Sequence, residues 1–327
     1  MTDVREAPLW SSERRRAPAE IDVLGIGQSS LDHVCLVDGL PRFAGKARIE
    51  SYQRMPGGQV ATAVLACRRL GLRAAFVGRV GGDEAGRQVL EPLRAAGVDV
   101  AGVRTIQEAP TQLAVILVDR ESGERTVLWH RDARLALQRG DVRRDEIERA
   151  RALHLDGGDP DAGAFAAKIA REAGVAVVLD ADTPSTGMAE LLAHVDFPVV
   201  SRDFAQAFFG TDDLADALRG LCNLGARLAV VTLGDVGAVA CDGSRFLASP
   251  GFKVEVRDTT GAGDVFHAAF VYGLLAGHGP ARILRAANAA SALNCRALGA
   301  QGGLPSVTEL EGFLAAHAPE AWRGPAL

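Results

Sequence analysis

The chain has 327 residues, of which 48% are hydrophobic and 24% are charged, and its formal net charge is −5. This balance is typical of a globular protein with a large core, offers no positive field for nucleic acid, and contains no apolar run of the roughly 18 to 20 residues that would span a membrane. Five cysteines without a Cys-x-x-Cys spacing indicate neither a disulfide framework nor a zinc site, which favours a reducing cytoplasm.

The N-terminal segment, residues 1–20, carries Arg14, Arg15 and Arg16 without an apolar stretch behind them. It therefore does not fit a secretory signal, and we expect a disordered leader. From Ile21 onward, short β-branched runs alternate with alanine-rich amphipathic runs, which predicts an α/β domain with a mostly parallel sheet covered by helices over 21–319 and a tail at 320–327. Strands are expected at 21–25, 74–80, 152–155, 175–179, 197–200 and 228–232.

Two stretches break this alternation. The first, between residues 31 and 55, contains Gly39, Pro41 and Gly45 among short polar and apolar pieces. The second contains strand-like runs at 113–119 and 125–130 on either side of a turn, which is the pattern of a β-hairpin. Together they predict a small β-sheet, built from about 32–56 and 111–131, that stands off the main sheet.

The C-terminal quarter changes to helices, expected at 262–276, 280–296 and 306–316, with glycine and proline at each boundary. Before them, the alternation in Lys253-Val254-Glu255-Val256 predicts a strand that leads into a turn rich in threonine and glycine. Glycines in such a turn let backbone N–H groups point at a common centre, and a helix N-terminus behind them favours a phosphate group.

The turn itself is the string from Asp258 to Asp264, Asp-Thr-Thr-Gly-Ala-Gly-Asp. An aspartate in a first helical turn is also explained by the helix dipole, which it stabilises by roughly 0.3 to 1 kcal/mol. The whole string, however, resembles the C-terminal ATP and phosphate motif of the ribokinase-like (PfkB) family. That resemblance implies an anion hole at Gly261, Ala262 and Gly263 and a catalytic base at Asp264.

The same resemblance extends over most of the chain and implies a ribokinase-like fold, a mostly parallel central sheet flanked by helices with a small β-sheet lid. It implies an ATP-dependent carbohydrate kinase that uses Mg²⁺, acts on a small sugar-like molecule and forms a homodimer through the lid. It also implies a possible K⁺ site beside the anion hole, to which Asp258 and Thr260 would contribute oxygens.

The acceptor end of the site is implied by a second motif, in which Gly57 and Gly58 let a sugar approach the backbone. Gln59 follows, and Thr62 stands where the family usually has asparagine. Asp32, seven residues after the first strand-ending glycine, resembles the family's clamp for two sugar hydroxyls, since a carboxylate offers two acceptor oxygens. Lys46 is added as a group that would meet an anionic acceptor.

The nucleotide end is implied by a strand-closing threonine, Thr232, and the turn glycines Gly234 and Gly237, with Asn288 on the helix that lies against adenine in relatives. The family's Asn-x-x-Glu pattern, tied to magnesium, is absent, and Ser201-Arg202-Asp203-Phe204 stands in its place. We still expect magnesium to be required, because it neutralises the nucleotide phosphates.

Several alternatives stay open. Gly25-Ile26-Gly27 is a weak dinucleotide-binding signal, and Gly45-Lys46 lacks the Ser or Thr of a phosphate-binding P-loop. Parts of the motifs are similar to the sulfofructose kinase branch, and the acceptor is a neutral or acidic sugar, a sugar phosphate or a nucleoside. A nucleoside kinase and a catalytically silent sugar or nucleotide sensor are the alternative functions. His267, on the same helix face as Asp264, is interpreted as structural.

Overall fold

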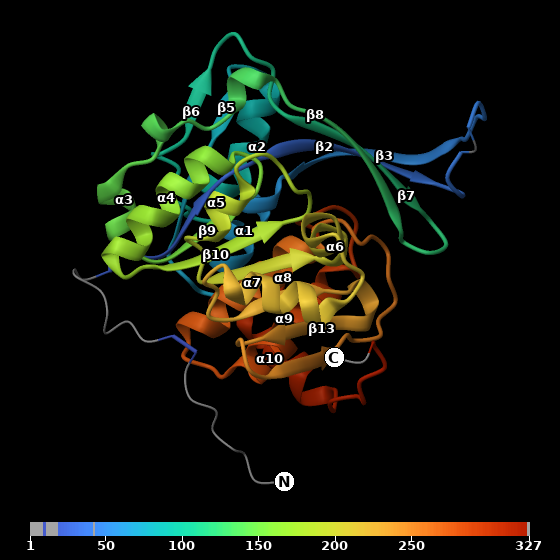
Figure 1. Ribbon diagram of the computed structural model, residues 1–327. Coiled ribbons are helices and arrows are strands. Elements are labelled where there is room, and N and C mark those ends of the chain that lie inside the picture. The colour runs from blue at the N-terminus through green and yellow to red at the C-terminus, as the bar shows by residue number, and fades with distance from the viewer. Residues whose placement is uncertain (1–8, 11–18, 42, 326–327) are drawn as a thin grey trace.

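A central sheet of eight strands organises the chain in the computed structural model, which describes residues 9–10, 19–41 and 43–325 (Figure 1). Its strands are β1 (Ile21–Ile26), β4 (Ala74–Val77), β9 (Ala150–Asp156), β10 (Ala176–Ala181), β11 (Phe197–Ser201), β12 (Ala229–Thr232), β13 (Gly237–Cys241) and β14 (Phe246–Pro250). They lie in the order β14-β13-β12-β11-β10-β9-β1-β4. The strands from β4 to β12 are parallel, and β13 and β14 are antiparallel additions at one edge.

Helices cover both faces of this sheet. One face packs against α1 (Gln59–Arg69), α2 (Glu84–Ala95), α8 (Ala262–Leu275), α9 (Pro280–Asn294) and α10 (Val307–Ala316). The other packs against α3 (Arg144–Glu148), α4 (Pro160–Ala173), α5 (Met188–Leu192), α6 (Arg202–Phe209) and α7 (Leu214–Asn223). Strand β10 shows why its sequence is apolar throughout: Val178 belongs to the first core and Val177 to the second, so both faces are buried.

A separate four-stranded sheet forms the predicted lid and extends away from the body (Figure 1). It contains β2 (Ser30–Val37), β3 (Ile49–Gly57), β7 (Leu113–Asp119) and β8 (Arg125–His130) in the order β3-β2-β7-β8. The predicted hairpin is confirmed as β7 and β8, with the bounds expected from the sequence. The ribokinase-like fold class, a mostly parallel sheet flanked by helices beside a small second sheet, is likewise confirmed.

Two sequence predictions are wrong in detail. The run 74–80 is not one strand, because β4 ends at Val77 and Gly78 separates it from the next strand. Beyond it, β5 (Arg79–Gly81) pairs with β6 (Arg104–Ile106) in a two-stranded sheet. The expected strand at Lys253–Val256 does not form. Its residues do alternate in exposure, but no neighbouring strand supplies the ladder hydrogen bonds that a strand requires.

Residues 1–8 and 11–18 of the expected leader lie outside the described residues. Between them, Trp10 is buried, packs edge-on against Phe197 with 6.1 Å between ring centroids, and stacks beneath Arg227 at 4.8 Å. No helix in the described part of the chain is long and apolar enough to cross a membrane.

Candidate active site at the start of α8

The residues predicted to form an anion hole, Gly261 to Gly263, lie at the start of α8. Gly261 precedes the helix with φ +77°, and a Cβ there would lie 2.4 Å from the carbonyl oxygen of Ala300. The Ala262 N–H turns back to the Thr259 carbonyl at 3.2 Å, whereas a Cβ on Gly263 would meet nothing within 4 Å. Because first-turn N–H groups have no partner within a helix, the N–H groups of Gly261, Gly263 and Asp264 remain unbonded in the described part of the chain.

Asp264 lies in the first turn of α8, the position that a general base needs. Burial raises its pKa well above the ordinary carboxyl range, and the negative charges of Asp180, Asp32 and Asp182 raise it further. The positive charge of Arg125 acts in the opposite direction. A carboxylate with a raised pKa next to open N–H donors can take a proton from a hydroxyl while the donors hold the developing charge.

The carboxylate of Asp258 lies behind the anion hole and is completely buried. It accepts hydrogen bonds from the Thr260 N–H at 2.8 Å and from the Gly299 N–H at 2.7 Å. In the described part of the chain it pairs with no arginine or lysine, and the buried Thr260 hydroxyl has no partner there. A buried site with a carboxylate and a hydroxyl oxygen has the kind of donor atoms that fit a monovalent cation.

The acceptor side begins with Asp32 on β2. The Ser30 hydroxyl donates to it at 2.6 Å, and burial raises the Asp32 pKa to about 6, against the effect of that hydrogen bond and with a further increase from the charge of Asp258. A Cβ on Gly57 would lie 1.9 Å from the Asp32 Oδ2 atom. The first glycine of the pair is therefore required so that the Asp32 carboxylate can occupy its place.

The remaining residues of that motif lie at the start of α1. Gly58 has φ +94°, and a Cβ there would lie 2.4 Å from Ser29 Cα. The Gln59 amide contacts Asp182 at 3.5 Å. Thr62 is fully buried, and its hydroxyl accepts a hydrogen bond from Gln301 at 3.3 Å. Gly58 and Gln59 therefore lie at the start of α1, and the Thr62 side chain is buried against Gln301.

Lys46 does not lie beside Asp32 and Gly57. It lies in the loop that joins β2 to β3, which Figure 1 shows at the end of the lid away from the body. There it lines a cavity with Asp38 and Glu50. Asp32 is near the opposite end of β2, so the strand alone separates the two by roughly 15 Å at about 3.3 Å per residue.

The turn of the lid hairpin touches the anion hole directly, a contact that the sequence did not reveal. The Gly123 carbonyl accepts hydrogen bonds from the Thr259 N–H at 3.1 Å and the Thr259 hydroxyl at 3.2 Å. The Arg125 guanidinium donates to the same hydroxyl at 2.9 Å. These hydrogen bonds connect the lid to the phosphate motif. They form at the hairpin turn, in which Gly123 has φ +72°.

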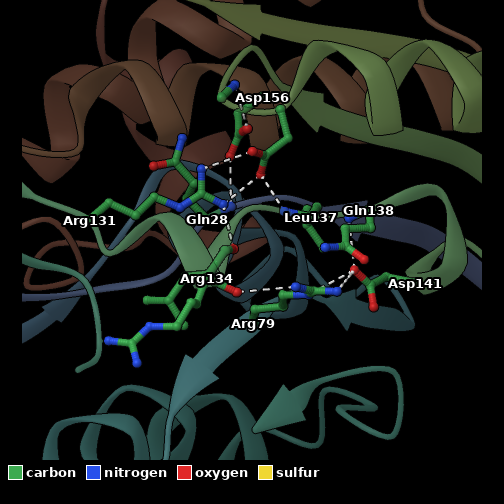
Figure 2. Close-up of polar contacts among 11 residues, drawn as sticks. Gln28, Arg79, Arg131, Arg134, Leu137, Gln138, Asp141 and Asp156 are labelled. Carbon is green, nitrogen blue, oxygen red and sulfur yellow. Dashed lines mark hydrogen bonds and ion pairs between the residues drawn. The ribbon is translucent and has the colours of Figure 1, made fainter. Parts of the chain in front are cut away.

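A second missed feature is the polar wall at the end of β9, shown in Figure 2. Asp156 accepts from the Gln28 N–H at 2.7 Å and from the Gly158 N–H at 3.0 Å. Burial raises its pKa to about 6, although these two backbone bonds oppose the shift. Arg131 next to it is paired with Asp159 at 2.5 Å. The sequence signal that could have identified Asp156 is an acidic residue at the carboxyl end of a parallel strand.

The residues predicted for the nucleotide side lie at the end of β12, in the β12–β13 turn and on α9. Thr232 closes β12 and donates to the Val200 carbonyl at 3.4 Å, while Gly234 and Gly237 have φ +60° and +118°. A Cβ on Gly237 would lie 2.2 Å from the Ser249 carbonyl oxygen. Asn288 is buried, and its amide nitrogen holds Ser249 through two bonds of 2.9 and 3.1 Å. That nitrogen is therefore engaged within the protein.

The segment that replaces Asn-x-x-Glu begins α6. The Ser201 hydroxyl accepts the Phe204 N–H at 3.1 Å and so caps the helix, and the Phe204 side chain is completely buried. Besides Ser201, Asp203 is the residue of this segment whose side chain carries oxygen atoms for a metal ion, and it is exposed.

Comparison with known proteins agrees with this arrangement. The profile of the pfkB family carbohydrate kinases matches residues 20–307. The chain is 31% identical to the ATP-dependent ribose-1-phosphate kinase of Halopiger xanaduensis, over 90% of this chain and 98% of that protein. It is 32% identical to fructokinase-1 of Zea mays, over 84% of this chain and 94% of that protein.

Among solved structures, a putative ribokinase from Agrobacterium tumefaciens superposes with a TM-score of 0.84 at 27% identity, covering 90% of this chain and 98% of that one. The family profile and the superposed structure both cover most of the chain. The chain therefore belongs to the pfkB family of carbohydrate kinases and is an ATP-dependent sugar kinase.

Proposed function

We propose that the chain transfers the γ-phosphoryl group of ATP to a hydroxyl of a sugar or sugar derivative, with Asp264 as general base. The observation that carries this proposal is the position of Asp264, a carboxylate with a raised pKa in the first turn of α8, next to the open N–H of Gly263. Asp32 acts on it electrostatically and supplies acceptor oxygens for the sugar hydroxyls.

In the proposed reaction, the acceptor hydroxyl gives its proton to Asp264 as its oxygen bonds to the γ-phosphorus, and the bond from that phosphorus to the ADP oxygen breaks. The N–H groups of Gly263 and Asp264 stabilise the charge on the transferring group. Magnesium bound to ATP would neutralise the nucleotide phosphates. Thr232, Gly234 and Gly237 form the nucleotide side.

The experiment that tests the function measures ATP consumption against neutral sugars, sugar acids, sugar phosphates and nucleosides, for the wild type and Asp32→Asn. One acceptor class should support turnover, and Asp32→Asn should raise its KM about tenfold, because a charged hydrogen bond contributes about 1.5 kcal/mol or more. Wild-type KM should also rise as the pH falls below about 6, where Asp32 takes up a proton. Acceptor-independent ATP hydrolysis would refute the proposal. No turnover on any class would refute it and favour a catalytically silent sensor.

A nucleoside kinase is the second candidate, and Trp129 favours it. Asp32 pairs with Ala114, and Ala114 pairs with Trp129, so the three side chains lie on one face of the lid. Trp129 is 68% exposed on the face that carries Asp32. An exposed indole there offers a stacking surface to a base or to the apolar face of a sugar ring. The nucleoside arm of the panel separates the two.

We also propose a K⁺ site at Asp258 and Thr260, supported by the buried carboxylate and the unpartnered hydroxyl described above. Replacing K⁺ with the larger tetramethylammonium, at constant ionic strength, should lower kcat several-fold, because the cation holds the segment that forms the anion hole. Asp258→Asn should remove the difference between the two salts. Equal rates in K⁺, Na⁺ and tetramethylammonium would contradict the site.

A homodimer through the lid is proposed on the apolar side chains that the lid exposes, Tyr52 at 53% and Leu128 at 59%. Exposed apolar patches of this kind mark interaction surfaces, and a second copy offers the same patch. Sedimentation should show a dimer that Leu128→Asp converts to monomer. Val236→Asp, at an exposed apolar residue outside the lid, is the control. A monomeric wild type at micromolar concentration would exclude the dimer.

A further inference from the structure

Three titratable side chains with no part in the proposed reaction lie together behind Asp264. They come from three elements: His154 from β9, Asp180 from β10 and His267 from α8. All three are buried, with exposed fractions of 1%, 7% and 3%. His267 Nε2 lies 3.1 Å from Asp180 Oδ1, and the two imidazole rings are 5.4 Å apart. A carboxylate buried this deep in a core costs free energy, which calls for a function.

The charge state of this cluster follows from its contacts. Burial by itself raises the pKa of Asp180, but the charge and hydrogen bond of His267 outweigh it, so the Asp180 pKa is lowered and its carboxylate stays ionised. Burial, with the charge of His267, lowers the His154 pKa to about 3, so that ring is neutral. The Asp180 carboxylate, which is hydrogen-bonded to the His267 imidazole, is therefore the charged group of the cluster that acts on its surroundings.

The pair lies where it acts on the general base. His267 follows Asp264 by three residues, so both project from the same face of α8. Asp180 is the charge with the strongest influence on Asp264, and it is the second-last residue of β10. The other groups that act on the two carboxyls are Asp32 from β2, Asp182 after β10, Arg125 from β8, Gln59 from α1 and His154 from β9.

We propose that Asp180 and His267 are a positioning pair that keeps a fixed negative charge behind Asp264 and thereby sets how readily Asp264 accepts the acceptor's proton. This inference rests on the proposed role of Asp264 as general base. A base is most effective when its proton affinity matches the working pH, and a neighbouring carboxylate is a direct means of raising it. His267 is then required because an unpaired buried Asp180 would itself take up a proton.

The test follows the protonation of Asp264 directly, by titrating the ¹³C signal of its carboxyl in the full-length protein and assigning that signal with Asp264→Asn. Asp180→Asn removes the charge but retains an acceptor for His267 Nε2. This variant should lower the pH at which Asp264 is half-protonated. The acid limb of the pH profile of kcat/KM should move to lower pH with it. The loss in kcat should be smaller than the roughly 100-fold or greater loss from removing the base itself.

His154→Leu is the matched control, since it changes an equally buried but neutral neighbour, and the Asp264 midpoint should not move. His267→Gln is the second variant. With no imidazole, burial makes Asp180 take up a proton, so the midpoint should again move to lower pH. A folded Asp180→Asn or His267→Gln protein with an unshifted midpoint would overturn the inference.

The titration also separates this inference from the proposed function. A shifted midpoint in a protein that phosphorylates no acceptor would support the electrostatic pair and refute the kinase mechanism. An active enzyme with unshifted midpoints would refute the pair alone.

Discussion

Replacing Asp264 with asparagine should lower kcat by about 10²- to 10⁴-fold, because proton transfer by a placed side chain contributes that much to a rate. The shape of the first turn of α8 is kept, since asparagine is nearly isosteric. ATP affinity should be retained or slightly increased, because a negative charge next to the phosphates is removed. Steady-state kinetics on the acceptor found by the panel, together with ATP-binding calorimetry, measure both effects.

Asp216→Asn is the control for Asp264→Asn. Asp216 is an exposed acid in the first turn of another helix, α7, and forms an ion pair with Arg219 at 3.4 Å. It reproduces the loss of a helix-dipole interaction without touching the site, so its kcat should match the wild type. Turnover by Asp264→Asn within a few-fold of the wild type would remove Asp264 from the mechanism.

Gly261→Ala should have the second largest effect and should damage the anion hole. A Cβ there would lie 2.4 Å from the Ala300 carbonyl oxygen and 2.6 Å from Ala300 Cα, backbone atoms that cannot rotate away. The residue also has φ +77°, which costs an alanine about 1 to 2 kcal/mol. The start of α8 must shift, and we expect a loss in kcat of about 10²-fold or more, as for removal of an oxyanion donor.

Gly277→Ala separates strain from the clash. Gly277 has φ +74° after the end of α8, but a Cβ there would meet nothing within 4 Å. Both variants should lose stability in urea from the strained backbone, whereas Gly261→Ala alone should lose activity. If both kept full kcat, the N-terminus of α8 would not be the phosphate site.

Local features of the sequence were sufficient for most of the fold. The β7–β8 hairpin was predicted with its observed bounds, because alternation and a turn lie within a few residues of each other. The central strands and the three C-terminal helices followed from runs that are apolar throughout or amphipathic. Lys253–Val256 shows the limit of this reasoning, since alternation alone does not supply a neighbouring strand to pair with.

The phosphate motif is the part of the site that the sequence by itself determined. The residues from Asp258 to Asp264 are contiguous, and the positive φ of Gly261 and the following helix are local properties of that string. Tertiary structure then decided which residues share the site with it. It brought Asp32 and Gly57 together, turned Thr62 to Gln301, engaged the Asn288 amide, and left Lys46 at the lid tip.

Tertiary structure alone also decided the partners of Asp264. Arg125 contacts Thr259 across 134 residues of chain, and Asp180 meets His267 only because β10 and α8 pack together. Such contacts leave no periodic trace in the sequence, since each requires two distant elements to be packed before the side chains meet. The local sequence determined the predicted phosphate motif, whereas the packing of the sheet, α8 and the lid determined the charges around Asp264, the proposed base.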